Sequence, residues 1–180
     1  MGVLTFRNFG ILERLVASGY LELIEDIEVT GSSVTSVQFS GFTATKEDTL
    51  VLVSDIQGNG TNPEYNVYAN NNQTASNYWL QYLRALSTSV TGARVNAPVM
   101  SYLATVKDSL TISDLKITND GYFTAQHYNN RDYGTVSITL QDNCVSSTFI
   151  ITSLTQLDIV GGANTIGIGS RFSLYKIVGV

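Results

Sequence analysis

Apolar and polar residues alternate with a period of two along most of this sequence. In the segment YLELIEDIEV, the apolar residues Leu21, Leu23 and Ile27 share one parity, and acidic residues occupy most of the other. Successive side chains of a β-strand point to opposite faces of a sheet, so this pattern predicts a strand with one buried face and one solvated face.

Short runs of the same kind recur along the chain, separated by residues that favour turns. The spacing of runs and turns predicts an all-β protein, an antiparallel β-sandwich of jelly-roll-like type, with residues 20–180 forming a single domain. The predicted strands cover 21–29, 34–39, 50–56, 65–69, 78–83, 99–106, 110–117, 122–127, 135–141, 147–160 and 172–178. The predicted turns lie at 31–33, 57–63, 70–72, 119–121, 129–130 and 161–162.

Parity also predicts which side chains face the core and where a strand is irregular. In LTISDLKIT the apolar parity shifts between Ile112 and Leu115. A β-bulge near Ser113 or Asp114 would keep both halves of this strand facing the core. The residues expected in the core are Leu23, Ile27, Leu52, Val136, Ile138, Phe149, Ile151 and Leu174.

Residues 1–19 differ from the rest of the sequence and predict a short N-terminal arm or helix. Phe9, Leu12, Leu15 and Val16 approximate one helical face, but the pattern is brief and equally suits an extended arm. A free tail would not leave so much apolar surface in water, so we expect this segment to anchor the chain to a neighbouring subunit. The candidate interface residues are Phe6, Phe9, Ile11, Leu12 and Leu15.

Composition narrows the range of partners. Charged residues make up 14% of the chain, and the formal net charge is −5. Phosphate backbones are bound by clustered positive charge, so we expect no nucleic-acid partner. No apolar run approaches the roughly 20 residues of a membrane helix, and we expect no membrane partner. Uncharged polar residues and ten tyrosines suit extended protein interfaces and favour a structural or binding role.

The sequence holds few residues of the types that carry catalysis or bind metals. His127 is the only histidine and Cys144 the only cysteine. His127 is expected in an exposed hairpin, and Cys144 in a turn without a cationic neighbour to activate it. We therefore expect no enzyme activity, no cofactor and no metal. The acidic residues Glu22, Glu25, Asp26 and Glu28 are expected to form a solvated strand edge that discourages pairing with other sheets.

A second kind of partner, a glycan, is suggested by aromatic and amide residues around the predicted turn at 129–130. Aromatic faces stack on sugar rings, and amides hydrogen-bond to hydroxyl groups. The same residues are also common in ordinary hairpins. The candidate exposed loop contacts are Tyr128, Asn129, Asn130 and Tyr133.

Several segments, in the same order along the chain, resemble a group of tailed-bacteriophage virion proteins. The final run GIGSRFSLYKI resembles the closing segment of those chains. The segments LVLVSD, YNVYAN, TASNYWLQYL and LTISDLKITNDGYF are similar to that group as well, so that the resemblance covers most of residues 21–177.

The resemblance implies a non-enzymatic virion component with a jelly-roll-like fold, made in the host cytoplasm and located at the surface of the phage particle. A capsid decoration or cement protein, bound to the major capsid protein or other virion proteins and stabilising the head, is the favoured function. A neck or tail fibre or adhesin module that binds host-surface glycans is the alternative. By analogy with related virion modules, the protein is expected to form a homotrimer.

Overall fold

The computed structural model describes residues 20–59, 64–86, 89–102, 108–133, 137–161 and 165–178. This part of the chain is all-β, and its only helix is the 3-10 turn η1 (Ala75–Asn77). None of the described residues forms a helix that is long and apolar enough to cross a membrane. The prediction of an antiparallel all-β protein is therefore confirmed.

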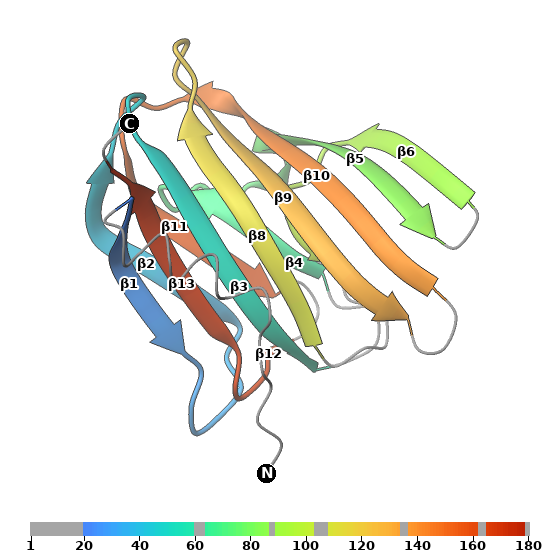
Figure 1. Ribbon diagram of the computed structural model, residues 1–180. Helices are drawn as coiled ribbons and strands as arrows, with labels where there is room; N and C mark the ends of the chain where they lie inside the picture. The colour runs from blue at the N-terminus through green and yellow to red at the C-terminus, as the bar shows by residue number, and fades with distance from the viewer. Residues whose placement is uncertain are drawn as a thin grey trace.

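The strands form two antiparallel sheets, arranged as in a sandwich (Figure 1). The large sheet has the order β1 (Leu21–Glu28), β13 (Arg171–Ile177), β3 (Thr49–Asn59), β8 (Asp108–Ile117), β9 (Tyr122–Tyr133), β10 (Ser137–Ile150), β5 (Tyr78–Leu86) and β6 (Ser89–Val95), with the short β12 (Thr165–Ile166) paired to β3. The small sheet has the order β2 (Ser36–Ala44), β11 (Leu154–Gly161), β4 (Glu64–Ala69) and β7 (Val99–Tyr102).

The core lies between the two sheets. Period-two alternation places one face of most strands inward, and burying a large apolar side chain contributes about 1.5–3 kcal/mol. Side chains that are less than 2% exposed come from both sheets and include Phe39, Leu50, Leu52, Ile56, Tyr65, Tyr78, Leu115, Phe123, Leu154 and Phe172.

Two of the residues predicted for the core, Leu52 and Leu174, are fully buried. Three others, Ile27, Phe149 and Ile151, are partly buried and pack against it. Leu23 was wrongly predicted, since it is 49% exposed. The register between β1 and β13 shifts between Leu23 and Glu25, and this irregularity breaks the parity on which the prediction relied. Val136 and the side chain of Ile138 lie outside the described residues.

The predicted bulge in β8 is also wrong. Strand β8 pairs with β3 on one side and β9 on the other in unbroken register through Ser113 and Asp114. The residues of β8 that face the core are all buried; they are Thr111, Ser113, Leu115 and Ile117. The apolar parity shifts because two inward positions are polar, and the strand itself stays regular.

Several strand boundaries differ from the prediction. The run predicted over 147–160 is divided between β10 and β11, which belong to different sheets. Strand β9 continues through Asn129 and Asn130, where a turn was predicted. Strand β6 was not predicted. The predicted turn at 70–72 is confirmed, with positive φ at Asn70 and Asn71.

Candidate interaction surface

His127 lies inside the molecule rather than in an exposed hairpin, which corrects the prediction. It occupies the inward face of β9 with no exposed surface, and its Nδ1 lies 2.7 Å from Ser113 Oγ on β8. Burial without a charged partner lowers the pKa of His127 to about 3, so the ring is neutral at physiological pH. The serine–histidine pair has no surface through which a substrate could reach it.

Two further polar side chains accompany this pair. Ser54 on β3 lies opposite Thr111 on β8, and both residues are fully buried. Ser54 Oγ and His127 Nε2 have no hydrogen-bond partner among the described residues. Burying a polar atom without a hydrogen-bond partner costs about 1–3 kcal/mol. The inward face of the large sheet thus changes from apolar to polar along β8 and β9, while Ser54 is a single polar position between Leu52 and Ile56 on β3.

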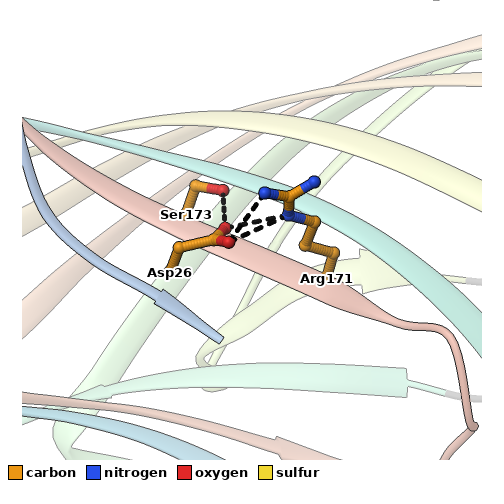
Figure 2. Close-up of polar contacts among 3 residues, drawn as sticks. All are labelled: Asp26, Arg171 and Ser173. Carbon is orange, nitrogen blue, oxygen red and sulfur yellow. Dashed lines mark hydrogen bonds and ion pairs between the residues drawn. The ribbon is translucent and has the colours of Figure 1, made fainter. Parts of the chain in front are cut away.

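The acidic residues of β1 lie at an edge of the large sheet, as the sequence predicts. Asp26 is held by β13 (Figure 2): Arg171 Nε donates to Oδ1 and Oδ2 at 3.0 and 3.1 Å, and Nη2 donates to Oδ2 at 2.7 Å. Ser173 Oγ donates a further hydrogen bond to Oδ1. The hydrogen bonds from Arg171, followed by those from Ser173 and the charge of Arg171, lower the pKa of Asp26. This carboxylate joins β1 to β13.

No group of three or more histidine, cysteine, aspartate or glutamate side chains within the described residues is arranged to hold a metal ion. Cys144 lies within β10, opposite Gln126 and Gln81 in the neighbouring strands, and not in a turn as predicted. His127 and Cys144 thus lie on different strands, β9 and β10. The contact of His127 with Ser113 was not predicted, since Ser113 was named only as a possible bulge position.

The hairpin formed by β5 and β6 carries much of the exposed apolar surface. We call Tyr78–Leu86 and Ser89–Val95 the projecting hairpin, because Figure 1 shows these strands extending to one side, away from β2 and β11. Its first residues, Tyr78 and Leu80, are buried in the core. Farther along, Leu83 is 57% exposed and Val90 is 67% exposed.

A groove with a volume of about 570 Å³ lies along the projecting hairpin. Its lining residues are Gln81, Tyr82, Leu83, Gly92, Ala93, Arg94 and Gln126. The guanidinium carbon of Arg94 lies 4.6 Å from the ring centroid of Trp79, within the range of a cation–π interaction. A Cβ on residue 92 would lie 3.3 Å from the Tyr82 carbonyl oxygen, so Gly92 allows β6 to approach β5 closely. The groove offers amides, one cation and apolar surface.

A second groove, of about 410 Å³, lies among three connections at one end of the sandwich. It is formed by the β2–β3 turn, the β8–β9 turn and the segment between β10 and β11. Gly121 has a φ of +84°, and a Cβ there would lie 2.6 Å from Ile150 Cγ2. Ile151 N donates to Gly121 O at 2.8 Å, so these connections are held against one another.

The four residues predicted as exposed loop contacts lie in β9. Asn130 pairs with Leu110 of β8 and Leu140 of β10, and Tyr133 pairs with Ser137. Tyr128 is 46% exposed, and Asn129 is its neighbour in the strand. They form part of a sheet and not a loop, because β9 continues past the predicted turn. Phe6, Phe9, Ile11, Leu12 and Leu15 lie outside the described residues.

Sequence reasoning missed the surface residues of the projecting hairpin, although β5 contains a signal for them. Trp79 and Leu83 stand on one parity of YWLQYL, and Leu80 and Tyr82 on the other. A strand with apolar residues on both parities is usually buried on both faces. In this structure one face of β5 packs on the core near Leu80, while Leu83 on the other face is exposed.

Neither protein-family models nor curated proteins yield a match to this sequence.

Proposed function

We propose that this chain is a non-enzymatic structural protein of a tailed-bacteriophage virion, built on a jelly roll. The observation that carries the proposal is the nested pairing of eight strands. The first pairs with the last, β1 with β13; then β2 pairs with β11, β3 with β8, and β4 with β7. This nesting is what results when one long hairpin of four strand pairs is rolled into two sheets, and viral capsid domains use such jelly rolls.

Two hairpins interrupt this nested order, and both widen the large sheet. β5 and β6 are inserted between β4 and β7, and β9 and β10 between β8 and β11. Antiparallel insertions of this kind add surface without adding a second core. A broad sheet with an exposed apolar hairpin is suited to contacts with other proteins.

The interior of the protein supports a role without catalysis. His127 is the only histidine in the sequence and is fully buried with a lowered pKa. A general base must reach the proton that it removes, and a residue without exposed surface does not reach a substrate. The buried pair of Ser113 and His127 fits a structural role inside the sheet.

Capsid decoration is the favoured position in the particle. Decoration proteins add contacts across junctions of the capsid, and the groove of the projecting hairpin offers apolar and uncharged polar contacts with a single cation. We propose the apolar segment 1–19 as the anchor and a trimer as the assembled form. The major capsid protein is the proposed partner.

One observation favours the alternative, a neck or tail fibre module that binds glycans. Gln81 and Gln126 supply amides to the groove. Trp79 on β5 and Tyr128 on β9 are 37% and 46% exposed, on two strands of the same sheet that are separated by β10. Stacking on aromatic rings and hydrogen bonding by amides are the contacts that recognise sugars.

The experiment adds purified protein to phage particles that lack it. Leu83→Lys is compared with Ile168→Lys, since Leu83 and Ile168 are 57% and 56% exposed and only Leu83 lies on the projecting hairpin. We expect wild type and Ile168→Lys to bind the particles and raise their resistance to heat, and Leu83→Lys to bind less. Deletion of residues 1–19 should also reduce binding.

Two outcomes would contradict parts of this proposal. Absence of the chain from purified virions, measured by mass spectrometry, would refute the virion assignment. Particles that lack the protein and keep their heat resistance, but fail to adsorb to cells, would refute decoration and support the fibre alternative. Binding of purified protein on a glycan array would add to that support.

A further inference from the structure

Strand β6 ends the large sheet and has an open side. It packs mainly against β5, and residues 90–95 are exposed on both faces of the strand. Val90 is 67% exposed on one face and Val95 is 41% exposed on the other. The side of β6 that faces away from β5 carries backbone N–H and C=O groups with no strand beside them among the described residues.

The other sheet edges are protected in ways that β6 is not. Strand β1 carries four acidic residues and a shift of register. Strand β2 has Gly41 at a φ of +76° and an irregular pairing with β11. Strand β7 has four residues within the part of the chain that the structure describes. Strand β6 has seven residues in regular register, no proline, no acid and one charged side chain, Arg94. Edges without charge, bulge or proline are templates for another strand.

We propose that β6 pairs antiparallel with β6 of a second copy of this chain, about a twofold axis at Gly92. The sequence of β6 is complementary to itself in this register. Gly92 lies opposite Gly92, so no side chains collide on the axis. Thr91 lies opposite Ala93, and Val90 opposite Arg94. A twofold contact places the same residues on both sides, and like charges are never opposite one another here.

A second copy is the occupant that the charges favour. Arg94 is the only charged side chain of β6, and it lies over the Trp79 ring of its own chain. In the proposed register it faces Val90 of the partner. Because Trp79 already contacts its charge, Arg94 needs no acidic residue from the partner. The joined β6 strands would connect two large sheets into one continuous sheet. An edge contact of seven residues is small, so we expect a concentration-dependent association rather than a permanent dimer.

Position 90 gives a test in which the sign of one charge decides the result. Val90→Glu places an acid opposite Arg94 of the partner at both ends of the contact, and Val90→Arg places like charges there. Two symmetric cross-strand charge pairs should change the dissociation constant by roughly 2- to 30-fold, tighter for Val90→Glu and weaker for Val90→Arg. The double variant Val90→Arg with Arg94→Glu restores the attraction and should regain the association of Val90→Glu.

Sedimentation equilibrium of the full chain over a range of concentrations measures the association. We expect the mass to double, from monomer to dimer, or from trimer to hexamer if residues 1–19 also join the chains. Val90 is exposed, so circular dichroism of all variants should match that of wild type. A wild-type mass that never doubles, or equal weakening by Val90→Glu and Val90→Arg, would overturn the proposal. The test contains no phage particles, so its result is independent of the virion assignment.

Discussion

The two edges of the large sheet are built in opposite ways. At one edge, β1 carries Glu22, Glu25 and Glu28 with its register shift, and Asp26 is tied to Arg171. At the other edge, β6 carries no acid and keeps a regular register to β5. Among the strands that the structure describes, each of the two has a neighbour on one side only, but only β1 combines several charges with irregularity, which are the usual protections of an edge.

The difference shows how one sheet can close a core and still offer a surface. Strand β1 lies where the sandwich closes, since Val29, which follows it, is buried and bonded to Ser170 through its backbone. Strand β6 is the outer strand of an inserted hairpin: its neighbour β5 supplies Tyr78 and Leu80 to the core, while residues 90–95 of β6 are exposed. Because β6 contributes no buried face to the core, its residues can suit contacts with another chain. The following predictions test this difference between β6 and the strands that form the core.

The largest expected effect compares the same substitution at two leucines. Leu52→Ala removes a fully buried side chain from β3 and should cost about 2–5 kcal/mol of unfolding free energy. Leu83→Ala removes a side chain that is 57% exposed on the projecting hairpin, and should cost less than about 1 kcal/mol. Denaturant unfolding measures both. Equal losses would show that the hairpin is as much a part of the core as β3.

Much of this fold could be predicted from sequence, because most strands have one buried face and one solvated face. β3 and β13 were found this way, with Leu52 and Leu174 inside. The prediction failed where polar residues occupy inward positions. Ser113 and His127 are polar and inward, so β8 appeared to contain a bulge and His127 appeared exposed.

The edge strand β6 could not be predicted, because it has no buried face to detect. The residues of β6 are small or polar, and Val90 and Val95 lie on opposite faces. A strand that is exposed on both faces leaves no period-two signal in the sequence. Pairing of β9 with β10 through Asn129 and Asn130 was hidden for a related reason, since asparagine favours turns in the absence of sheet contacts.

The second prediction tests whether the interior is dry where β8 meets β9. His127 has its pKa lowered from 6.5 to about 3, so below pH 6.5 the unfolded chain binds a proton that the folded chain does not. Stability should therefore fall as the pH drops from 6.5 toward 3, by about 1.4 kcal/mol per pH unit and about 2 kcal/mol at pH 5.

The control for this prediction is His127→Gln, which keeps a polar side chain beside Ser113 and removes the titrating ring. Denaturant unfolding at pH 7.5 and pH 5 gives the change in unfolding free energy for each protein. The loss should be smaller in the variant than in wild type by about the amount assigned to His127. The same loss in both proteins would mean that water reaches the ring.

The third prediction concerns the ion pair at the β1 edge. Asp26→Asn removes the charge that accepts hydrogen bonds from Arg171 and Ser173. Arg171 is well exposed, so we expect a loss of only about 1 kcal/mol. The folded pKa of Asp26 is lowered, so its contribution is present above the unfolded value of 3.8 and is lost as the pH falls through the folded value. Glu28→Gln on the same strand should change stability less; an equal change would assign the effect to net charge.

The last prediction has the smallest expected effect on stability at each substituted site, and it separates the acidic side chains of β1 from its register shift as protections of this edge. Glu22→Thr, Glu25→Thr and Glu28→Thr together make the composition of β1 similar to that of β6, and should change the unfolding free energy by less than about 0.5 kcal/mol per site, as is usual for surface positions. The variant also carries Val90→Arg, which weakens pairing at β6, so that new association must arise elsewhere. A control neutralises Glu47, Glu64 and Asp120 in the same background and loses the same number of charges. Association of the β1 variant alone would show that the acids guard this edge. If neither protein associates, the register shift between Leu23 and Glu25 is sufficient protection, because a kinked strand does not align its free backbone groups with those of another copy.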